Sequence, residues 1–214
     1  MKTTKILALL LAVVTVFGLC ACAKDVRGTI GNDEEEAQLE PGSASGKTYT
    51  NRFLGIGCTL KDGWTFSTDE QIAELNGNAQ KVLGDDYKKM VEKTDIVYDM
   101  VASDGNGNSF NVNITNMGSA FNLIYSEEDF ARLSMEQTPQ MMASAGFDVT
   151  DTAISTVTFA GAQHTAIAMT ATYNGVTVFE RIVCIKKGSY MACVTFAVLD
   201  KADIDGLCGT FYGL

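Results

Sequence analysis

The chain has 214 residues, with 16 Lys and Arg against 26 Asp and Glu, so its formal net charge is −10 at pH 7. This acidic balance argues against nucleic-acid binding, which needs a basic surface, and against adhesion to anionic lipid headgroups. The length suits one domain with a sizeable core. An acidic surface can attract cationic ligands, although solubility alone also explains it.

The N-terminus carries a short positive segment followed by an apolar run. Lys2 and Lys5 precede the uncharged residues 6–18. Crossing a ~30 Å hydrocarbon core takes about 20 apolar residues, so the run fits a cleaved signal peptide better than a membrane-spanning helix. We expect residues 1–21 to be that signal peptide. Its removal takes away two lysines and no acid, which leaves 14 basic against 26 acidic residues, a net charge of −12.

Residues 19–22 read Leu-Cys-Ala-Cys and end the apolar run. Two cysteines compete as the modified residue. Cys20 follows bulky Leu19, a poor residue at a cleaved bond, whereas Cys22 follows small Ala21. The pattern resembles the lipobox of bacterial lipoproteins, which implies lipidation of Cys22 and anchoring on the extracytoplasmic face of the bacterial cell membrane. The alternative is an ordinary secretory signal cleaved nearby, without lipid.

Residues 22–47 are expected to form the lipidated cysteine and a flexible acidic tether. Residues 33–36 are all acidic and residues 41–46 are small, and neither stretch has apolar periodicity. Such a segment cannot bury enough surface to offset the entropy of ordering it. About 25 flexible residues span on the order of 25–30 Å, so the tether gives the domain reach. The acidic run is interpreted as a solvated spacer rather than a metal site.

A single folded domain is expected from residue 48 to residue 214. Residues 49–60 predict a strand or a hairpin pair, and the turn that follows places Trp64, the only Trp, on the core. Ser67 as N-cap and Glu70 three residues later predict a capping box. The helix that they open is expected to break at an Asn-Gly-Asn sequence at 76–78, with a second helical piece after it at 79–92.

A hairpin follows, with strands at 96–102 and 110–115. In the second strand, apolar residues alternate with Asn111, Asn113 and Thr115. This strict period of two predicts a half-buried strand with one polar face.

Ser126 and the acids at 127–129 predict the start of another helix, because acids are favoured near a helix N-terminus. The same reasoning explains Asp85 and Asp86 without catalysis. Pro139 should kink or split this helix. Three methionines are interpreted as core or groove packing rather than as a metal site: Met135, Met141 and Met142.

The last third of the chain reads mostly as strands, at 152–159, 164–173, 176–185 and 190–199. Asn174-Gly175 joins two of them and is the strongest short hairpin signal. Residues 200–203 should cap a short terminal helix that carries Ile204, Leu207, Cys208 and Phe211.

The predicted order is β-β-α-β-β-α-β-β-β-β-α. Consecutive hairpins imply an α+β fold, an α/β/α sandwich with a mainly antiparallel sheet of about six or seven strands flanked by helices. With Asp62-Gly63-Trp64 closing the first strands and a terminal helix after a meander, this order resembles the PsbP-like fold over about residues 48–214. That family is named after a photosystem II subunit and includes bacterial lipoproteins of unknown role. No site residue of those proteins is matched here, so the resemblance implies a fold and no activity.

His164 is the only histidine, so a Ser-His-Asp or Cys-His catalyst would need it. A two-residue turn at Asn174-Gly175 would put it opposite Ile185, near a strand end, and no nucleophile motif accompanies it. The sequence has no Walker loop, dinucleotide fingerprint or HExxH. We therefore expect no catalytic residue and no cofactor.

Asp104, Asn106 and Asn108 have the spacing of the first half of a calcium loop. The twelfth position is Thr115 instead of an acid, and the stretch lies between strands rather than helices. We expect a polar hairpin loop and no metal.

Four cysteines lie in the domain: Cys58, Cys184, Cys193 and Cys208. None forms a C-x-x-C motif, so zinc or thioredoxin chemistry has no local support. With a turn at Gly188-Ser189, Cys184 faces Cys193 in a non-hydrogen-bonded pair, near the separation that a disulfide spans. A turn shifted by one residue would put Cys184 opposite Met191 instead. A disulfide and two buried thiols both stay open, as does a bond between the other two cysteines.

The expected function is a membrane-anchored binding or interaction module for an envelope protein, a wall component or a small ligand. One alternative is a cell-envelope hydrolase, which predicts His164 in a pocket beside a Ser or Asp. Another is an assembly factor of an envelope complex, which predicts a large apolar surface patch. A two-lobed solute-binding protein would need a longer chain.

Overall fold

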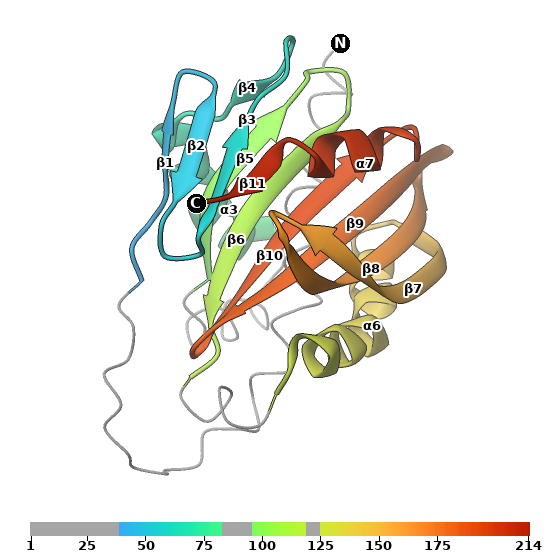
Figure 1. Ribbon diagram of the computed structural model, residues 1–214. Helices are drawn as coiled ribbons and strands as arrows, with labels where there is room; N and C mark the ends of the chain where they lie inside the picture. The colour runs from blue at the N-terminus through green and yellow to red at the C-terminus, as the bar shows by residue number, and fades with distance from the viewer. Residues whose placement is uncertain (1–38, 83–95, 119–124) are drawn as a thin grey trace.

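The computed structural model describes residues 39–82, 96–118 and 125–214 (Figure 1). Four predictions lie outside the described residues: the signal peptide, the lipobox with Cys20 and Cys22, the acidic run, and most of the second helical piece with Asp85 and Asp86. Within the described residues, no helix is both long and apolar enough to cross a membrane.

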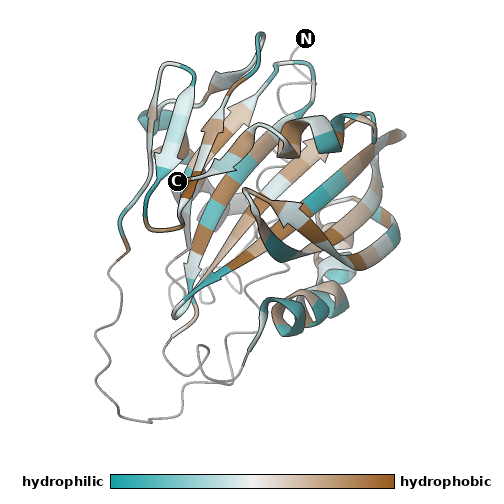
Figure 2. Ribbon diagram, in the orientation of Figure 1, coloured by the Kyte–Doolittle hydropathy of each residue, from teal (hydrophilic) through white to brown (hydrophobic). Residues whose placement is uncertain are grey.

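A seven-stranded antiparallel sheet forms the body of the domain, in the order β4-β5-β6-β10-β9-β8-β7. Its strands are β4 (Thr65–Phe66), β5 (Ile96–Ser103), β6 (Ser109–Asn116), β7 (Asp148–Phe159), β8 (Ala162–Tyr173), β9 (Val176–Lys187) and β10 (Tyr190–Val198). The α+β class and the expected six or seven antiparallel strands are confirmed. Hydrophobic and hydrophilic residues alternate along these strands in Figure 2.

A second, four-stranded sheet has the order β1-β2-β3-β11. Its strands are β1 (Ser43–Ser45), β2 (Thr48–Asn51), β3 (Ile56–Thr59) and β11 (Phe211–Gly213). Its inner strands β2 and β3 are the hairpin pair predicted at 49–60, whereas its outer strands β1 and β11 were not predicted. Two expectations are wrong here: Phe211 lies in β11 opposite Cys58 instead of in the terminal helix, and residues 43–45 pair with β2 instead of belonging to a flexible tether.

Three helices complete the described structure: α3 (Asp69–Val82), α6 (Glu127–Ser144) and α7 (Asp203–Cys208). The capping box of α3 is one residue later than predicted. The Thr68 hydroxyl accepts from the Gln71 N–H at 3.3 Å, and the Gln71 side chain accepts from the Thr68 N–H at 2.9 Å. The break predicted at 76–78 is wrong, because α3 continues through it, and α6 likewise runs unsplit through Pro139.

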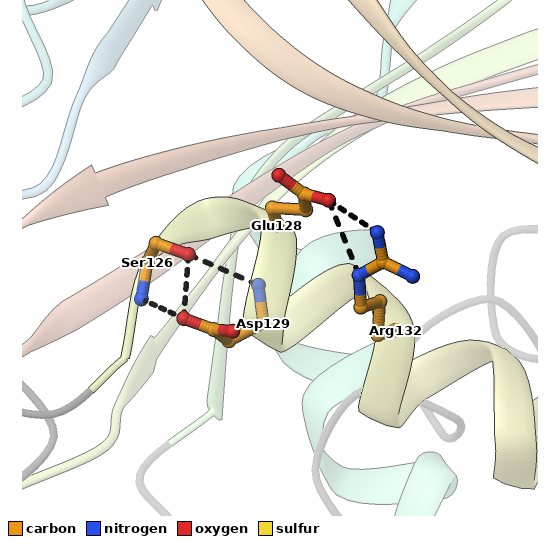
Figure 3. Close-up of polar contacts among 4 residues, drawn as sticks. All are labelled: Ser126, Glu128, Asp129 and Arg132. Atoms are coloured by element: carbon orange, nitrogen blue, oxygen red, sulfur yellow. Dashed lines mark hydrogen bonds and ion pairs between the residues drawn. The ribbon is translucent and has the colours of Figure 1, made fainter.

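The start of α6 is as the sequence predicts. Ser126 is the N-cap: its hydroxyl accepts from the Asp129 N–H at 3.1 Å, and the Asp129 carboxylate accepts from the Ser126 N–H at 2.9 Å (Figure 3). Glu128 and Arg132 form an exposed ion pair one turn apart (Figure 3). Only local contacts are needed for this motif, so four residues of sequence suffice to find it.

The two faces of the large sheet have different covers. On one face, the second sheet and α7 enclose a core that includes Tyr49, Phe110 and Phe196, and Trp64 stacks on Phe110 with ring centroids 5.1 Å apart. On the other face, α3 and α6 cover two smaller apolar clusters, one of which buries Met142 completely. The placement of Trp64 and the packing role of Met142 are thereby confirmed.

The Asn174-Gly175 turn has the expected register, and the second turn takes the Gly188-Ser189 alternative of the two that the sequence left open. Tyr173 pairs with Val176 across Asn174-Gly175, whose φ angles are 50° and 79°, as a type I′ turn requires. Lys187 pairs with Tyr190 across Gly188-Ser189, so Cys184 lies directly opposite Cys193. Neither forms a disulfide in this structure, and both are buried, as is Cys58; Cys208 is partly exposed and also outside any disulfide.

Candidate functional site

Polar side chains of β6 lie inside the protein. Asn111, Asn113 and Thr115 are 1 %, 2 % and 4 % exposed, and Ser109 on the same face is 2 % exposed. The prediction of a half-buried strand with a polar outer face is therefore wrong. Strand alternation was read correctly, but β6 is a central strand with neighbours on both sides and covers on both faces, so its polar face is enclosed.

Two polar residues from neighbouring strands extend this polar face. Thr195 on β10 pairs directly with Asn111, and directly paired residues of an antiparallel sheet share a face. Glu180 on β9 pairs with Ala197 of β10, two residues after Thr195 and on the same face. We call the following group the polar floor: Ser109, Asn111, Asn113, Glu180 and Thr195.

Three members of the polar floor surround the small side chain of Ala197. Ser109 pairs with Ala197 from β6, Glu180 pairs with it from β9, and Thr195 lies two residues before it. These three hold all the buried side-chain oxygens that lack a hydrogen-bond partner within the described part of the chain: both carboxyl oxygens of Glu180 and the hydroxyl oxygens of Ser109 and Thr195. The sheet register thus gathers every one of these unpaired atoms at one place.

Buried hydroxyls elsewhere on this face have partners. Ser134 and Thr138 on α6 donate to the carbonyl oxygens of Phe130 and Ser134, each at 2.7 Å. Within the polar floor, the Asn113 amide donates to the Asn111 side-chain oxygen at 3.4 Å. Because native proteins satisfy nearly all buried polar groups, an unpaired cluster marks a place where the protein lacks a partner.

Glu180 carries the only carboxyl group of the polar floor. The residue is 1 % exposed, and desolvation by burial raises the pKa of its carboxyl from 4.5 to about 8. The next residue, Arg181, points to the opposite face of the sheet and pairs with Asp205 on α7. At neutral pH the carboxyl is therefore mostly protonated.

Apolar side chains border the polar floor. The cluster that contains Ala197 also includes residues of α3, α6 and the strands on either side, among them Leu75, Met142, Tyr98, Val101, Met169 and Val178. A second cluster on the same face includes Ile182 beside Thr195, and the paired Cys184 and Cys193. The polar floor is thus a small hydrogen-bonding surface set between two apolar ones.

The hydrolase alternative directs attention to His164. Its Nδ1 lies 2.9 Å from the Glu127 carboxylate, the first residue of α6. The same carboxylate accepts from the backbone N–H groups of Thr165 at 2.9 Å and Lys186 at 3.0 Å. Burial opposes ionisation of Glu127, but these three hydrogen bonds outweigh it and lower the pKa of the carboxyl. The group fastens α6 to β8 and β9, and the neighbour of His164 is a Glu, whereas the hydrolase alternative predicts a Ser or Asp.

The calcium-like stretch is a hairpin loop, as predicted. Asp104 accepts from the N–H groups of Asn106 at 2.7 Å and Asn108 at 3.1 Å, and from the Asn108 side chain at 2.8 Å. The loop's own donors therefore occupy the carboxylate. Among the described residues, no group of three or more His, Cys, Asp or Glu side chains could hold a metal ion.

Sequence reasoning did not single out Asp99, which is the extra residue of a bulge in β5. Its carboxylate accepts from the Gly42 N–H, the Tyr49 hydroxyl and the Asn51 amide. It borders a pocket of about 200 Å³ between β1, β4, β5 and the start of α3, which Asp69 also lines. Because three donors from the chain already engage this carboxylate, we interpret Asp99 as a structural link.

Sequence reasoning also missed Glu180, although a signal was present. In the strand predicted at 176–185, positions 178, 180 and 182 share one face, and Glu180 stands between Val178 and Ile182. A charged residue on an otherwise apolar strand face is either an edge residue or a buried functional group. The sequence alone cannot distinguish an edge residue from a buried one. The strand order does, because it places β9 between β10 and β8, inside the sheet.

Comparison with known proteins gives similar folds only. No profile of a known protein family matches this chain, and no curated protein matches it. Similar solved structures include PsbP (CyanoP) from Synechocystis sp. PCC 6803, at 12 % identity and a TM-score of 0.42, covering 87 % of this chain and 100 % of that chain. Another is LpqN of Mycobacterium tuberculosis, described as involved in cell envelope biogenesis, at 14 % identity and a TM-score of 0.33, covering 72 % and 76 %. The candidate site therefore rests on this chain's own residues.

Proposed function

We propose that this chain is a lipid-anchored protein of the bacterial cell envelope whose domain binds a small ligand on the polar floor, without catalysis. The observation that carries the proposal is the unpaired carboxyl of Glu180 beside the unpaired hydroxyls of Ser109 and Thr195. Each buried group left unpaired costs about 1–3 kcal/mol. A ligand that supplies the missing partners recovers this free energy, so the folded domain carries a built-in preference for one.

The anchor rests on the sequence around Cys22. An alkyne-tagged fatty acid fed to bacteria that express the full-length chain should label the protein. Cys22→Ser should abolish the label and release the protein from the membrane fraction, whereas Cys20→Ser should leave both unchanged. Labelling that survives Cys22→Ser, or membrane retention without any label, would refute the lipid anchor.

The binding function can be tested without knowing the ligand. Native mass spectrometry of the full-length chain, purified from bacterial membranes, should show a bound small mass that heating or acid releases. The double variant Glu180→Gln/Thr195→Val should lose this mass, and the exposed change Arg132→Ala should retain it. A chain that carries no additional mass, or the same mass in all three proteins, would refute binding on the polar floor.

The hydrolase alternative keeps one supporting observation. A carboxylate that holds one ring nitrogen of a histidine, as Glu127 holds His164, is the arrangement that orients a catalytic base in hydrolases. Cell-wall hydrolysis that is lost in His164→Ala would favour this alternative. The remaining alternative is an assembly factor of an envelope complex, and a crosslinked pull-down from intact cells tests it. A specific envelope partner that is retained in His164→Ala would favour an interaction or assembly role over a hydrolase.

A further inference from the structure

The polar floor offers hydrogen-bond acceptors and lacks a positive partner. Glu180, Thr195 and Ser109 each present at least one unpaired oxygen, and the register places them on three sides of Ala197. On the strands, the residues directly paired with Glu180 are Ala197 and Met169, neither of which can donate from its side chain. The nearest cation along the chain, Arg181, is committed to Asp205 on the other face.

The surroundings favour one kind of cation. Hard divalent ions take six or more oxygen ligands, and this site offers a single carboxyl group. A primary ammonium group has three N–H donors, which equals the number of acceptor side chains around Ala197. The neighbouring Met169, Met142 and Tyr98 suit an organic substituent, since methionine packs adaptably against apolar groups and aromatic rings attract cations.

We propose that the polar floor binds a small primary amine as its ammonium ion, with Glu180 as the charge partner and Thr195 and Ser109 as additional acceptors. This inference rests on the proposed binding function and names its ligand class. The net charge of −10 also raises the concentration of cations near the chain.

The proposal has a pH signature. An ammonium ion binds the ionised carboxylate, so binding below pH 8 must displace the proton of Glu180. The other titratable groups that pack on this sheet face are Tyr98, Tyr125, Tyr173, Cys184, Cys193 and Lys186, with Glu127 at the start of α6. The buried residues in the body of α6 are not ionisable. Affinity should therefore rise about tenfold per pH unit from pH 5 to 7 and level off near pH 8.

Calorimetry of the full-length chain in a nonionic detergent tests the ligand class. The probes are n-butylammonium chloride, its neutral analogue n-butanol, and potassium chloride. We expect saturable binding of butylammonium alone. Glu180→Gln should weaken it at least tenfold, while Asp151→Asn, the same kind of carboxyl-to-amide substitution on exposed β7, should leave it within twofold.

The outcomes separate this inference from the proposed function. Equal binding of butanol, or butylammonium binding that survives Glu180→Gln, would overturn the ammonium ligand while leaving a ligand on the polar floor. Competition by potassium at equal concentration would overturn it in favour of a bare-cation site. If the natural chain also carries no bound mass, the binding function itself fails.

Discussion

The backbone N–H of Gly42 donates to the carboxylate of Asp99 at 2.8 Å, although 57 positions separate the two residues. This bond marks where the chain that follows the predicted anchor joins the domain, six residues before residue 48, where the domain was predicted to begin. A side chain at position 42 would collide with Asp99, because an added Cβ would lie 2.6 Å from its carboxylate and 2.6 Å from the Tyr49 ring.

Gly42→Ala should therefore loosen this junction. We expect a loss of about 1–3 kcal/mol in the free energy of unfolding, as for other overpacked sites. Urea unfolding of the full-length chain measures it, with the exposed Ser43→Ala as the control. Limited proteolysis should also cut the Gly42→Ala protein sooner near residue 42. Equal stability and equal cutting of the two variants would show that the bond to Asp99 does not hold this segment.

Asp99, which is only partly buried, should nevertheless matter to stability. Asp99→Ala leaves the Tyr49 hydroxyl and the Asn51 amide without their acceptor, and both residues are 0 % exposed. We expect a loss of about 2–6 kcal/mol, from two buried groups at about 1–3 kcal/mol each.

Asp62→Ala is the matched control for Asp99→Ala. Asp62 pairs with Lys47 in full contact with solvent, which screens the ion pair, so its removal should change the free energy of unfolding little. A similar small effect at both positions would contradict the structural role of Asp99. Both variants are measured by the same urea titration.

Features that depend on few neighbouring residues were predictable from the sequence. The capping box at Ser126, the Asn174-Gly175 turn and the long C-terminal hairpins are fixed by local backbone chemistry. The register of Cys184 and Cys193 follows from the length of a single turn. These elements account for most of the large sheet.

Features that depend on distant pairing were not predictable. Phe211 belongs to a strand only because β3 is available to pair with it, and Asn111 is buried only because its strand lies between two others. Glu180 and Asp99 owe their roles to the same non-local order. The candidate site is made of such residues, and periodicity alone cannot distinguish an outer polar face from an enclosed one.

The paired thiols should form a disulfide when an oxidant is present. Cys184 and Cys193 are directly opposite each other on neighbouring strands. Refolding the chain in an oxidised glutathione buffer should yield a peptide that links the two, detected by mass spectrometry without reduction. Closing this short loop should stabilise the domain by about 2–3 kcal/mol in the chain-entropy estimate. Recovery of both as separately alkylated thiols would contradict the prediction.

Glu127 should stabilise the attachment of α6. Glu127→Gln removes a charge that accepts from His164, Thr165 and Lys186, and hydrogen bonds to charged groups are worth about 1.5–3 kcal/mol. We expect a loss of about 2 kcal/mol at pH 7. Glu128→Gln, in the adjacent exposed ion pair, should cost about 0.5 kcal/mol or less.

The effect of Glu127 should depend on pH. Its folded-state pKa lies below the ordinary value of 4.5, so its stabilisation is present above pH 4.5 and lost as the pH falls through the lowered pKa. Urea titrations at pH 7 and pH 3 should therefore show the difference between wild type and Glu127→Gln shrinking at the lower pH. A constant difference would place the effect in packing instead of in the carboxylate charge.

Glu180 should show the opposite dependence, because its folded-state pKa is raised to about 8 from an ordinary value of 4.5. Between these two values the unfolded chain loses the proton while the folded chain retains it, so the free energy of unfolding falls as the pH rises. The expected fall from pH 5 to pH 7 is on the order of 3 kcal/mol. Glu180→Gln has no such proton to retain and should be the more stable protein at pH 7.

Urea titrations of wild type and Glu180→Gln between pH 5 and pH 8 measure this difference, with Asp151→Asn as a control for net charge. The gap should widen steadily up to pH 8 and then stay constant. Adding n-butylammonium at pH 8 should close part of the gap by stabilising the wild type alone, since a ligand that binds only the folded state raises its stability. A gap that does not vary with pH would mean that Glu180 is already ionised and paired, and would remove the basis of the proposed ammonium site.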